Sequence, residues 1–167
     1  MIGAVVLAAG AATRFGSPKQ LLTLPSVLAA LAEAPVDEVV VVSGAYLVEA
    51  DGVRVVRCVD WARGPGASLR CGLRALADDA EAAVVVLADG PWLAPASVER
   101  VLAAWRETGG IAAACYDGER GHPVVLGRPT WDAIPDDGAR SLPARLVACD
   151  DLGSPGDVDT PADLASR

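Results

Sequence analysis

The segment AAVVVLAD, residues 82–89, decides the fold that this sequence predicts. Its apolar residues run from Ala82 to Ala88 without interruption, and such runs are typical of parallel strands that are covered on both faces. The run ends at Asp89, and Gly90-Pro91 then favours a turn. The segment therefore predicts a buried strand with a carboxylate directly after its carboxyl end.

Similar Val-rich runs alternate with helical patterns along the chain, which predicts right-handed crossovers and a three-layer α/β sandwich on a mostly parallel sheet. The segment AAACYDGERGHPVVL, residues 112–126, adds a late antiparallel excursion around an Asp-Gly turn. Near the end, Thr160 and Pro161 indicate a helix start, with Asp163 three residues after the cap. The predicted strands are 4–7, 38–42, 53–57, 83–87, 111–115 and 123–126, and the predicted helices are 26–34, 68–77 and 95–107.

Length and composition favour a single domain over residues 1–167. No apolar run reaches the roughly 18–20 residues of a membrane span, and Met1-Ile2 leads straight into the first predicted strand, so we expect a cytoplasmic protein. The net charge of −8 argues against nucleic acid or an anionic membrane as a partner, because both require a basic surface.

The four cysteines are far apart and show no CxxC spacing, and with a single histidine they make a poor zinc set. We interpret them as reduced, small hydrophobic residues, with a redox pair as the alternative. They are Cys58, Cys71, Cys115 and Cys149.

Like Asp89, the segment LAAGAATRFGSPK, residues 7–19, follows a predicted strand with residues that could bind a ligand. Gly10 allows backbone torsions that suit a phosphate-binding loop, and Arg14 and Lys19, the only lysine, add positive charge. The glycine spacing matches neither a dinucleotide fingerprint nor a P-loop. An ordinary strand–loop–helix connection is the alternative to a distinct phosphate loop.

Asp89 has two interpretations of its own. It is either a turn-former ahead of Gly90 or a hard oxygen ligand for Mg²⁺. The metal interpretation gains from the phosphate loop, because a triphosphate that crosses the sheet edge would bring its Mg²⁺ to the neighbouring strands.

Six segments in order resemble the nucleotidyltransferase family that includes the molybdenum-cofactor cytidylyl- and guanylyltransferases. They cover nearly the whole chain: 7–22, GASLRCGL at 66–73, LADGPWL at 87–93, GHPV at 121–124, GAR at 138–140 and DVDTPADL at 157–164. The resemblance implies a Rossmann-like nucleotidyltransferase sheet and an Mg²⁺-dependent enzyme of the EC 2.7.7 type. It would move NMP from an NTP to a phosphate of molybdopterin or a related small phosphorylated acceptor, releasing pyrophosphate.

The resemblance also implies residue roles. Backbone atoms of Leu7, Ala8, Ala9 and Gly10 would contact the nucleotide, with Ser68 near the base or ribose. Arg14, Lys19 and Asp89 would be catalytic, the first two on the triphosphate, and Asp89 would hold Mg²⁺ with Asp157. His122 would lie near the acceptor, although a hydrogen-bonded core position is the alternative. A structural role is favoured for Asp159 over a further metal ligand.

Ala9 favours CTP, because the guanylyltransferases of the family tend to carry Gly there. The sequence departs from the family pattern after Lys19, where a Gly-x-Pro-Leu segment is missing, and at Gly90, where Gln or Met is usual. Both departures fall near the acceptor. They keep open a nucleotide-binding module without transferase activity, or a subunit that needs a molybdoenzyme or maturation-factor partner; guanylyl transfer to a phospholactate-like phosphate is a further possibility.

Overall fold

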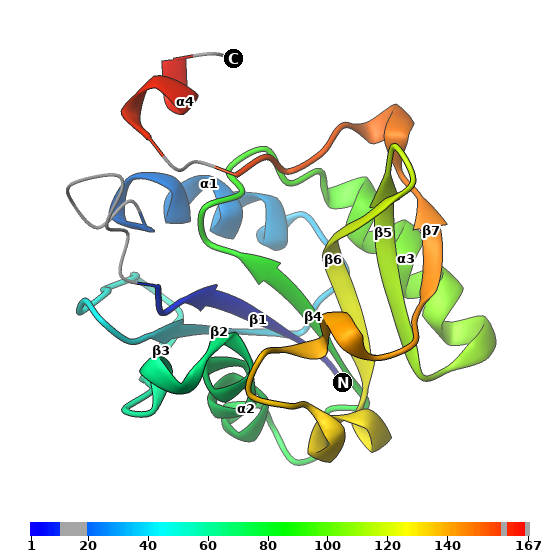
Figure 1. The fold of residues 1–167 in the computed structure, drawn as a ribbon, viewed down its shortest axis with the longest axis horizontal. Coiled ribbons are helices and arrows are strands. Elements are labelled where there is room, and N and C mark those ends of the chain that lie inside the picture. The colour runs from blue at the N-terminus through cyan, green and yellow to red at the C-terminus, as the bar shows by residue number, and fades with distance from the viewer. Residues whose placement is uncertain (11–19, 158–159, 166–167) are drawn as a thin grey trace.

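The computed structural model describes residues 1–10, 20–157 and 160–165 of the 167-residue chain. Its centre is a seven-stranded sheet in the order β3-β2-β1-β4-β6-β5-β7 (Figure 1). All neighbouring pairs are parallel except those of β6, which runs antiparallel to both β4 and β5. The strands are β1 Ile2–Ala8, β2 Glu38–Ser43, β3 Arg54–Arg57, β4 Ala82–Leu87, β5 Ile111–Tyr116, β6 Glu119–Gly127 and β7 Arg145–Ala148.

Helices cover both faces of the sheet, which gives the predicted three layers (Figure 1). Helices α1 (Gln20–Ala32) and α3 (Pro95–Thr108) pack on one face, and α2 (Pro65–Ala75) packs on the other. The remaining helices are short: α4 Pro161–Ala165, and the 3₁₀ turns η1 Trp61–Arg63, η2 Arg128–Ala133, η3 Ala139–Ser141 and η4 Asp150–Leu152.

The central strands are buried on both faces, which explains their unbroken apolar runs. In β4, Val84 and Val86 face α1 and α3, whereas Val85 faces α2, and each is at most 3% exposed. The two cores lie on opposite faces of one sheet because successive side chains of a strand alternate. The predicted fold class is confirmed.

Gly72 brings α2 close to the sheet. A Cβ atom at this position would lie 2.4 Å from Cγ1 of Val5 and 2.8 Å from Cγ2 of Val42. A side chain there would push α2 away from β1 and β2. The close packing at Gly72 therefore sets the distance between α2 and the sheet, and the amino end of α2 borders the site described below.

The predicted elements are present with shifted bounds, and β7 was not predicted. The Asp-Gly turn between β5 and β6 is confirmed, with positive φ at Asp117 and Gly118. At α4, the backbone N–H of Thr160 donates to the carboxylate of Asp163 at 2.7 Å, as the helix-start pattern predicts. In the part of the chain that the structure describes, no helix combines the length and apolarity that crossing a bilayer requires.

The interpretation of the cysteines is wrong for one pair. Cys58, just after β3, and Cys71, on α2, form a disulfide with Cα atoms 5.9 Å apart. Cys115 and Cys149 are free. The 13-residue separation carries no motif, and the two cysteines meet because the chain after β3 returns to pack α2 on the sheet.

Candidate functional site

The carboxyl ends of β1 and β4, which lead to the predicted phosphate loop and to Asp89, are neighbours at one edge of the sheet. Strands β1 and β4 pair in parallel with Leu7 opposite Leu87, and the N–H of Ala88 donates to the Leu7 carbonyl at 3.0 Å. The segment that follows β1 and the carboxylate that follows β4 therefore leave the sheet side by side. Ligands of open α/β sheets bind in the crevice outside the carboxyl ends of the strands.

The residues predicted to bind nucleotide are placed unevenly around this edge. Leu7 lines a cavity, Ala8 and Ala9 are buried behind it, and Gly10 is exposed. Ser68 is buried in the first turn of α2, next to Leu69, which lines the same cavity. Arg14, Lys19 and Asp159 lie outside the described residues.

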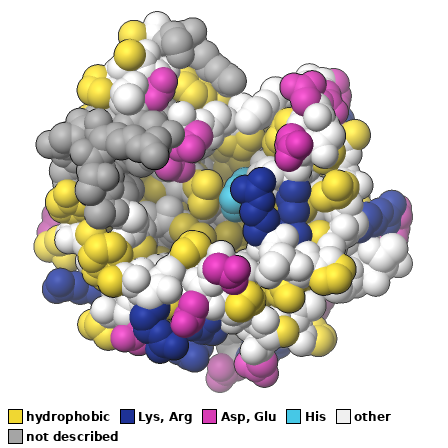
Figure 2. Space-filling model, in the orientation of Figure 1, with side chains coloured by type: hydrophobic (Ala, Val, Ile, Leu, Met, Phe, Trp, Pro, Cys, Tyr) yellow, Lys and Arg dark blue, Asp and Glu magenta, His cyan; other side chains and the backbone are white. Residues whose placement is uncertain are grey.

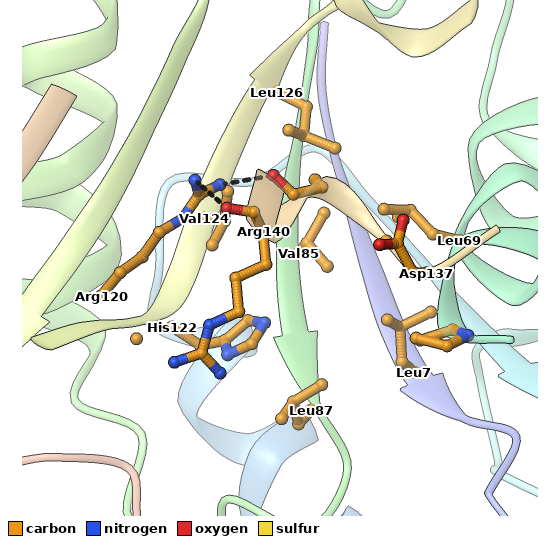
Figure 3. A pocket seen from close by; sticks show the side chains of 14 residues that line it. Leu7, Leu69, Val85, Leu87, Arg120, His122, Val124, Leu126, Asp137 and Arg140 are labelled. Atoms are coloured by element: carbon orange, nitrogen blue, oxygen red, sulfur yellow. Dashed lines mark hydrogen bonds between the residues drawn. The ribbon is translucent and has the colours of Figure 1, made fainter. Parts of the chain in front are cut away.

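The cavity has a volume of about 440 Å³ and lies on the α2 side of the sheet (Figure 3). Val85, Val124 and Leu126 come from β4 and β6, and Leu69 from α2. Polar side chains gather at one end, where Arg120, His122 and Arg140 line the cavity, while Asp137 lines it beside Leu69 (Figure 3). The cavity is thus a mainly apolar pocket with a cationic corner.

One wall of the cavity depends on close contact between α2 and residues 134–138. The N–H of Gly66 donates to the Asp136 carbonyl at 2.8 Å, and the Arg70 guanidinium donates to the Ile134 carbonyl at 2.7 Å and to the Asp136 carboxylate. A Cβ atom at Gly66 would lie 1.7 Å from the Pro135 carbonyl oxygen. Only glycine allows this approach, which explains the first residue of the GASLRCGL motif.

Arg120 fixes the wall on the other side. Its guanidinium donates to the carbonyl oxygens of Ala139 at 3.1 Å and Arg140 at 3.2 Å (Figure 3) and to that of Leu142, just after η3, at 2.8 Å. A half-buried arginine with its N–H groups committed in this way holds a loop. The backbone of Arg140 is therefore tied to β6.

Arg140 extends from η3 towards β6, and its guanidinium lies beside the His122 imidazole (Figure 3). The side chain is exposed, and within the described residues it forms no hydrogen bond or ion pair. Figure 2 shows basic side chains beside the chain's one histidine, at the edge of a hollow in this face.

His122 is held in the neutral form. The pKa of the imidazole is lowered to about 4, mainly by burial and also by the positive charges of Arg120 and Arg140, while the Asp89 carboxylate acts in the opposite direction. Its backbone carbonyl accepts a hydrogen bond from the Tyr116 hydroxyl at 2.8 Å. At neutral pH, His122 therefore offers hydrogen-bonding nitrogens and no charge.

A second cavity, of about 250 Å³, shares Leu87, Gly121 and His122 with the first and extends to Asp157. Residues 154–157 pack on the loop after β4: the N–H of Trp92 donates to the Pro155 carbonyl at 3.0 Å. A Cβ atom at Gly90 would lie 3.1 Å from Cβ of Pro155. Glycine at this departure from the family pattern thus leaves room for the segment that carries Asp157.

The donor set at this edge fits a divalent cation. Asp89 Oδ1 is a buried carboxylate oxygen, and Asp157 lines the second cavity together with Gly90, the residue after Asp89. Within residues 1–10, 20–157 and 160–165, no group of three or more His, Cys, Asp or Glu residues is arranged around a metal position. Mg²⁺ usually takes one or two carboxylates together with waters and substrate phosphates, so two aspartates suffice.

Arg120 and Arg140 are the site residues that the sequence analysis did not assign. Arg140 is part of the GAR motif, so a signal for it was present in the sequence. Arg120 binds backbone carbonyls that only the folded chain brings to it, so no residue pattern marks it.

The model of the MobA-like NTP transferase domain family matches residues 4–149. The chain therefore belongs to this family, and its members transfer nucleotidyl groups. The crystal structure of Rv0371c from Mycobacterium tuberculosis H37Rv superposes with a TM-score of 0.82 and 30% identity, over 98% of this chain and 95% of that one. A nucleotidyl transferase from Methanothermobacter thermautotroptrophicus shares the fold, with a TM-score of 0.76 and 21% identity over 99% and 94% of the two chains.

A further structure of Rv0371c, in complex with manganese, gives a TM-score of 0.77 and 29% identity over 98% of this chain and 96% of that one. A search of curated protein sequences gave no match.

Proposed function

We propose that residues 1–167 form a single cytoplasmic nucleotidyltransferase domain that moves CMP from CTP to a phosphate group of molybdopterin or a related small phosphorylated acceptor. One observation carries the proposal. A single cavity reaches from Leu7, at the end of the strand that leads into the phosphate loop, to the cationic corner at Arg140. Donor and acceptor could therefore meet in this cavity, at the strand edge where Asp89 follows β4.

The acceptor is the nucleophile in this reaction. An oxygen of its phosphate attacks the α-phosphorus of CTP, the bond from that phosphorus to the bridging oxygen breaks, and the electron pair leaves with pyrophosphate. A phosphate monoester is anionic near neutral pH, so no strong general base is needed. The neutral imidazole of His122 suits an orienting role beside the acceptor, where it can donate or accept a hydrogen bond.

The donor nucleotide, CTP, would be held by the loop after β1 and by a bound Mg²⁺. Backbone atoms of residues 7–10 would bind the nucleotide, with Ser68 close to its base or ribose, and Arg14 and Lys19 would neutralise the triphosphate. Asp89 and Asp157 would hold Mg²⁺, which when bound supplies positive charge to the phosphates and the leaving pyrophosphate. The manganese complex of the 29% identical Rv0371c supports a divalent cation.

The preference for CTP rests on Ala9. Its carbonyl accepts a hydrogen bond from the Ala45 N–H at 3.3 Å, and a Cβ atom at Gly44 would lie 2.7 Å from the same oxygen. The backbone of Ala9 is therefore packed against the loop after β2, and its methyl group is buried. We infer that this methyl group, which the guanylyltransferases of the family tend to lack, would favour the smaller base of CTP.

A binding module, or a subunit that needs a molybdoenzyme or maturation-factor partner, is the second candidate. The absence of a Gly-x-Pro-Leu segment after Lys19 favours it, because that segment helps to form the base and acceptor side in the family. Such a protein would bind nucleotide without releasing pyrophosphate when it is alone.

The test is a thermal-shift titration of CTP, GTP, ATP and UTP, with and without Mg²⁺ or Mn²⁺. We expect CTP with metal to raise the melting temperature of the wild type and of Asp51→Ala, an exposed aspartate before β3, but not of Asp89→Ala. Pyrophosphate release should then require both CTP and molybdopterin. Nucleotide binding without release would favour the second candidate, and no binding at all would overturn both.

A further inference from the structure

We propose that Arg140 binds the phosphate group of the acceptor substrate and that Arg120 is the positioning residue that holds Arg140 in place. The ligand identity rests on the proposed function, whereas the anion site itself rests on the geometry of the cavity. The ligand class is a phosphate monoester with an apolar or flat body.

The two arginines have different roles because their N–H groups are used differently. The Arg120 guanidinium donates to three carbonyls of residues 139–142, so its N–H groups are used within the protein. Arg140 lines the cavity, and within the described residues its guanidinium forms no hydrogen bond or ion pair. A planar guanidinium with open donors matches two oxygens of a phosphate, which makes Arg140 the group that is able to take the anion.

The neighbouring charges fix where the anion can lie. Asp137 lines the cavity beside Leu69, so its carboxylate repels an anion from that end (Figure 3). His122 is next to Arg140 and carries no charge at neutral pH. The positive charge at the His122 end of the cavity therefore comes from the arginines.

The apolar wall defines the rest of the ligand. On the β4 and β6 side of Leu7, the residues Val85, Leu87, Val124 and Leu126 line the cavity, and its volume of about 440 Å³ accommodates more than a phosphate. Contact with this wall should strengthen the binding of an aromatic phosphate over inorganic phosphate. An uncharged aromatic alcohol lacks the group that Arg140 recognises.

The single histidine provides the readout. We would follow the imidazole NMR signals of His122 at pH 7.5 during titration with phenyl phosphate, inorganic phosphate and phenol. We expect phenyl phosphate to bind at least fivefold more tightly than inorganic phosphate, and phenol to cause no saturable shift. Arg140→Ala should weaken phenyl phosphate at least tenfold, Arg140→Lys should weaken it less, and Arg74→Ala, an exposed arginine on α2, should behave as the wild type.

The role of Arg120 is tested by measuring its effect on acceptor binding and on CTP binding separately. Arg120→Ala should raise the acceptor KM and the phenyl phosphate Kd at least fivefold, while the CTP affinity stays within twofold; Arg120→Lys should restore part of the loss. A general loss of folding would weaken both ligands and lower the melting temperature, and Arg140→Ala then decides the question because its side chain is exposed.

Three results would overturn the proposal: Arg140→Ala binding as the wild type, inorganic phosphate or phenol binding as well as phenyl phosphate, or competitive displacement of phenyl phosphate by CTP with Mg²⁺. Displacement would assign the arginine to the donor site. If phenyl phosphate binds through Arg140 but no acceptor yields pyrophosphate, the proposed function fails and the anion site stands.

Discussion

At the scale of single residues, the site combines a neutral imidazole with a charged guanidinium. The two groups can lie side by side because burial keeps His122 unprotonated, so Arg140 meets no like charge from it. A protonated His122 would repel Arg140 from the cavity. The low pKa of the histidine therefore helps to keep the guanidinium where an acceptor phosphate would meet it.

We predict that His122 titrates with a pKa of about 4, well below the 6.5 of an ordinary histidine. The chain has one histidine, so an NMR pH titration of the imidazole reports it without assignment. Arg140→Ala should raise this pKa because it removes a positive charge, and Asp89→Asn should lower it because it removes a negative one. Arg74→Ala should leave it unchanged. A midpoint near 6.5 in the wild type would contradict the buried, neutral imidazole.

The same shift predicts a pH dependence of stability. The folded His122 has the lower pKa, so between about pH 4 and 6.5 the unfolded chain binds more protons. The stabilisation is fully present above pH 6.5 and is lost as the pH falls towards 4. The loss reaches at most about 3 kcal/mol, because the side chain is partly exposed.

Urea unfolding at pH 7 and pH 4.5 measures this loss. His122→Gln should lose less stability than the wild type over that interval. Asp136 and Asp151 have lowered pKa values because of their arginine partners, so their contributions are lost below the ordinary aspartate range and in both proteins. Equal losses in the two proteins would exclude His122 as the source.

At the scale of elements, the sequence predicts the central strands well and the edge poorly. Strand β4 is buried on both faces, so its apolar run is unbroken and easy to recognise. Strand β7, Arg145–Ala148, has four mostly exposed residues and no such run, because it lies at the edge of the sheet. Strand β6 begins four residues earlier than predicted, since Glu119, Arg120 and His122 are polar and interrupt the apolar pattern.

The candidate site divides in the same way. The positions of Asp89 and Gly10 at the carboxyl edge of the sheet could be predicted because each follows a buried strand, whereas their roles stay predictions. The contact between Arg120 and residues 139–142 could not, because its partners are backbone carbonyls that any sequence would supply. The disulfide between Cys58 and Cys71 depends on how α2 packs, which residue spacing does not encode.

We predict that Gly66→Ala destabilises the protein by about 1–3 kcal/mol, the usual cost of inserting atoms into a packed contact. The new Cβ would meet the Pro135 backbone at 1.7 Å, so α2 and residues 134–138 must separate. Phenyl phosphate binding should weaken because Asp137 and Gly138 line the cavity. Urea unfolding measures the first effect and the His122 signals the second.

Gly3→Ala is the matched control. The three atoms nearest to its Cβ, at the amino end of β1, would all belong to the side chain of Leu76, the first of them at 2.6 Å. A side chain can rotate away where a backbone carbonyl cannot, so the loss of stability should be smaller and the cavity unaffected. A Gly66→Ala variant that binds phenyl phosphate as the wild type would show that this wall tolerates displacement.

The disulfide gives a further prediction for α2. The purified protein should present two free thiols in urea, from Cys115 and Cys149, and four after reduction. Closing a loop of about this length stabilises by roughly 3 kcal/mol, so dithiothreitol should lower the free energy of unfolding by an amount of that order. Cys115→Ser should respond to the reductant as the wild type, and Cys71→Ala should not respond. Four thiols before reduction would contradict the bond.

At the scale of the whole molecule, one reversed strand assembles the site. Strand β6 runs antiparallel to β4 with Val124 opposite Val85, so its beginning lies where β4 ends. This reversal brings His122 and Arg120 to the same edge as Asp89, which a parallel strand would have placed at the opposite edge. The late antiparallel excursion is therefore the feature of the topology that brings the residues proposed to bind the acceptor to the carboxyl edge of the parallel strands.

That arrangement predicts a sequential reaction with direct transfer. Donor and acceptor would occupy one cavity together, and the acceptor phosphate itself attacks the α-phosphorus, so no covalent nucleotidyl-enzyme should form. Initial rates at varied CTP and molybdopterin should give intersecting double-reciprocal lines, because both substrates must bind before pyrophosphate leaves. A single in-line displacement should invert the configuration at the α-phosphorus of an α-thio analogue of CTP.

Three results would instead indicate a covalent intermediate and ping-pong transfer: parallel double-reciprocal lines, retention of configuration at the α-phosphorus, or protein that stays labelled by α-³²P-CTP after quenching. Arg140→Ala should keep the intersecting pattern and raise only the acceptor KM, since it weakens one substrate without changing the order of bond making and breaking.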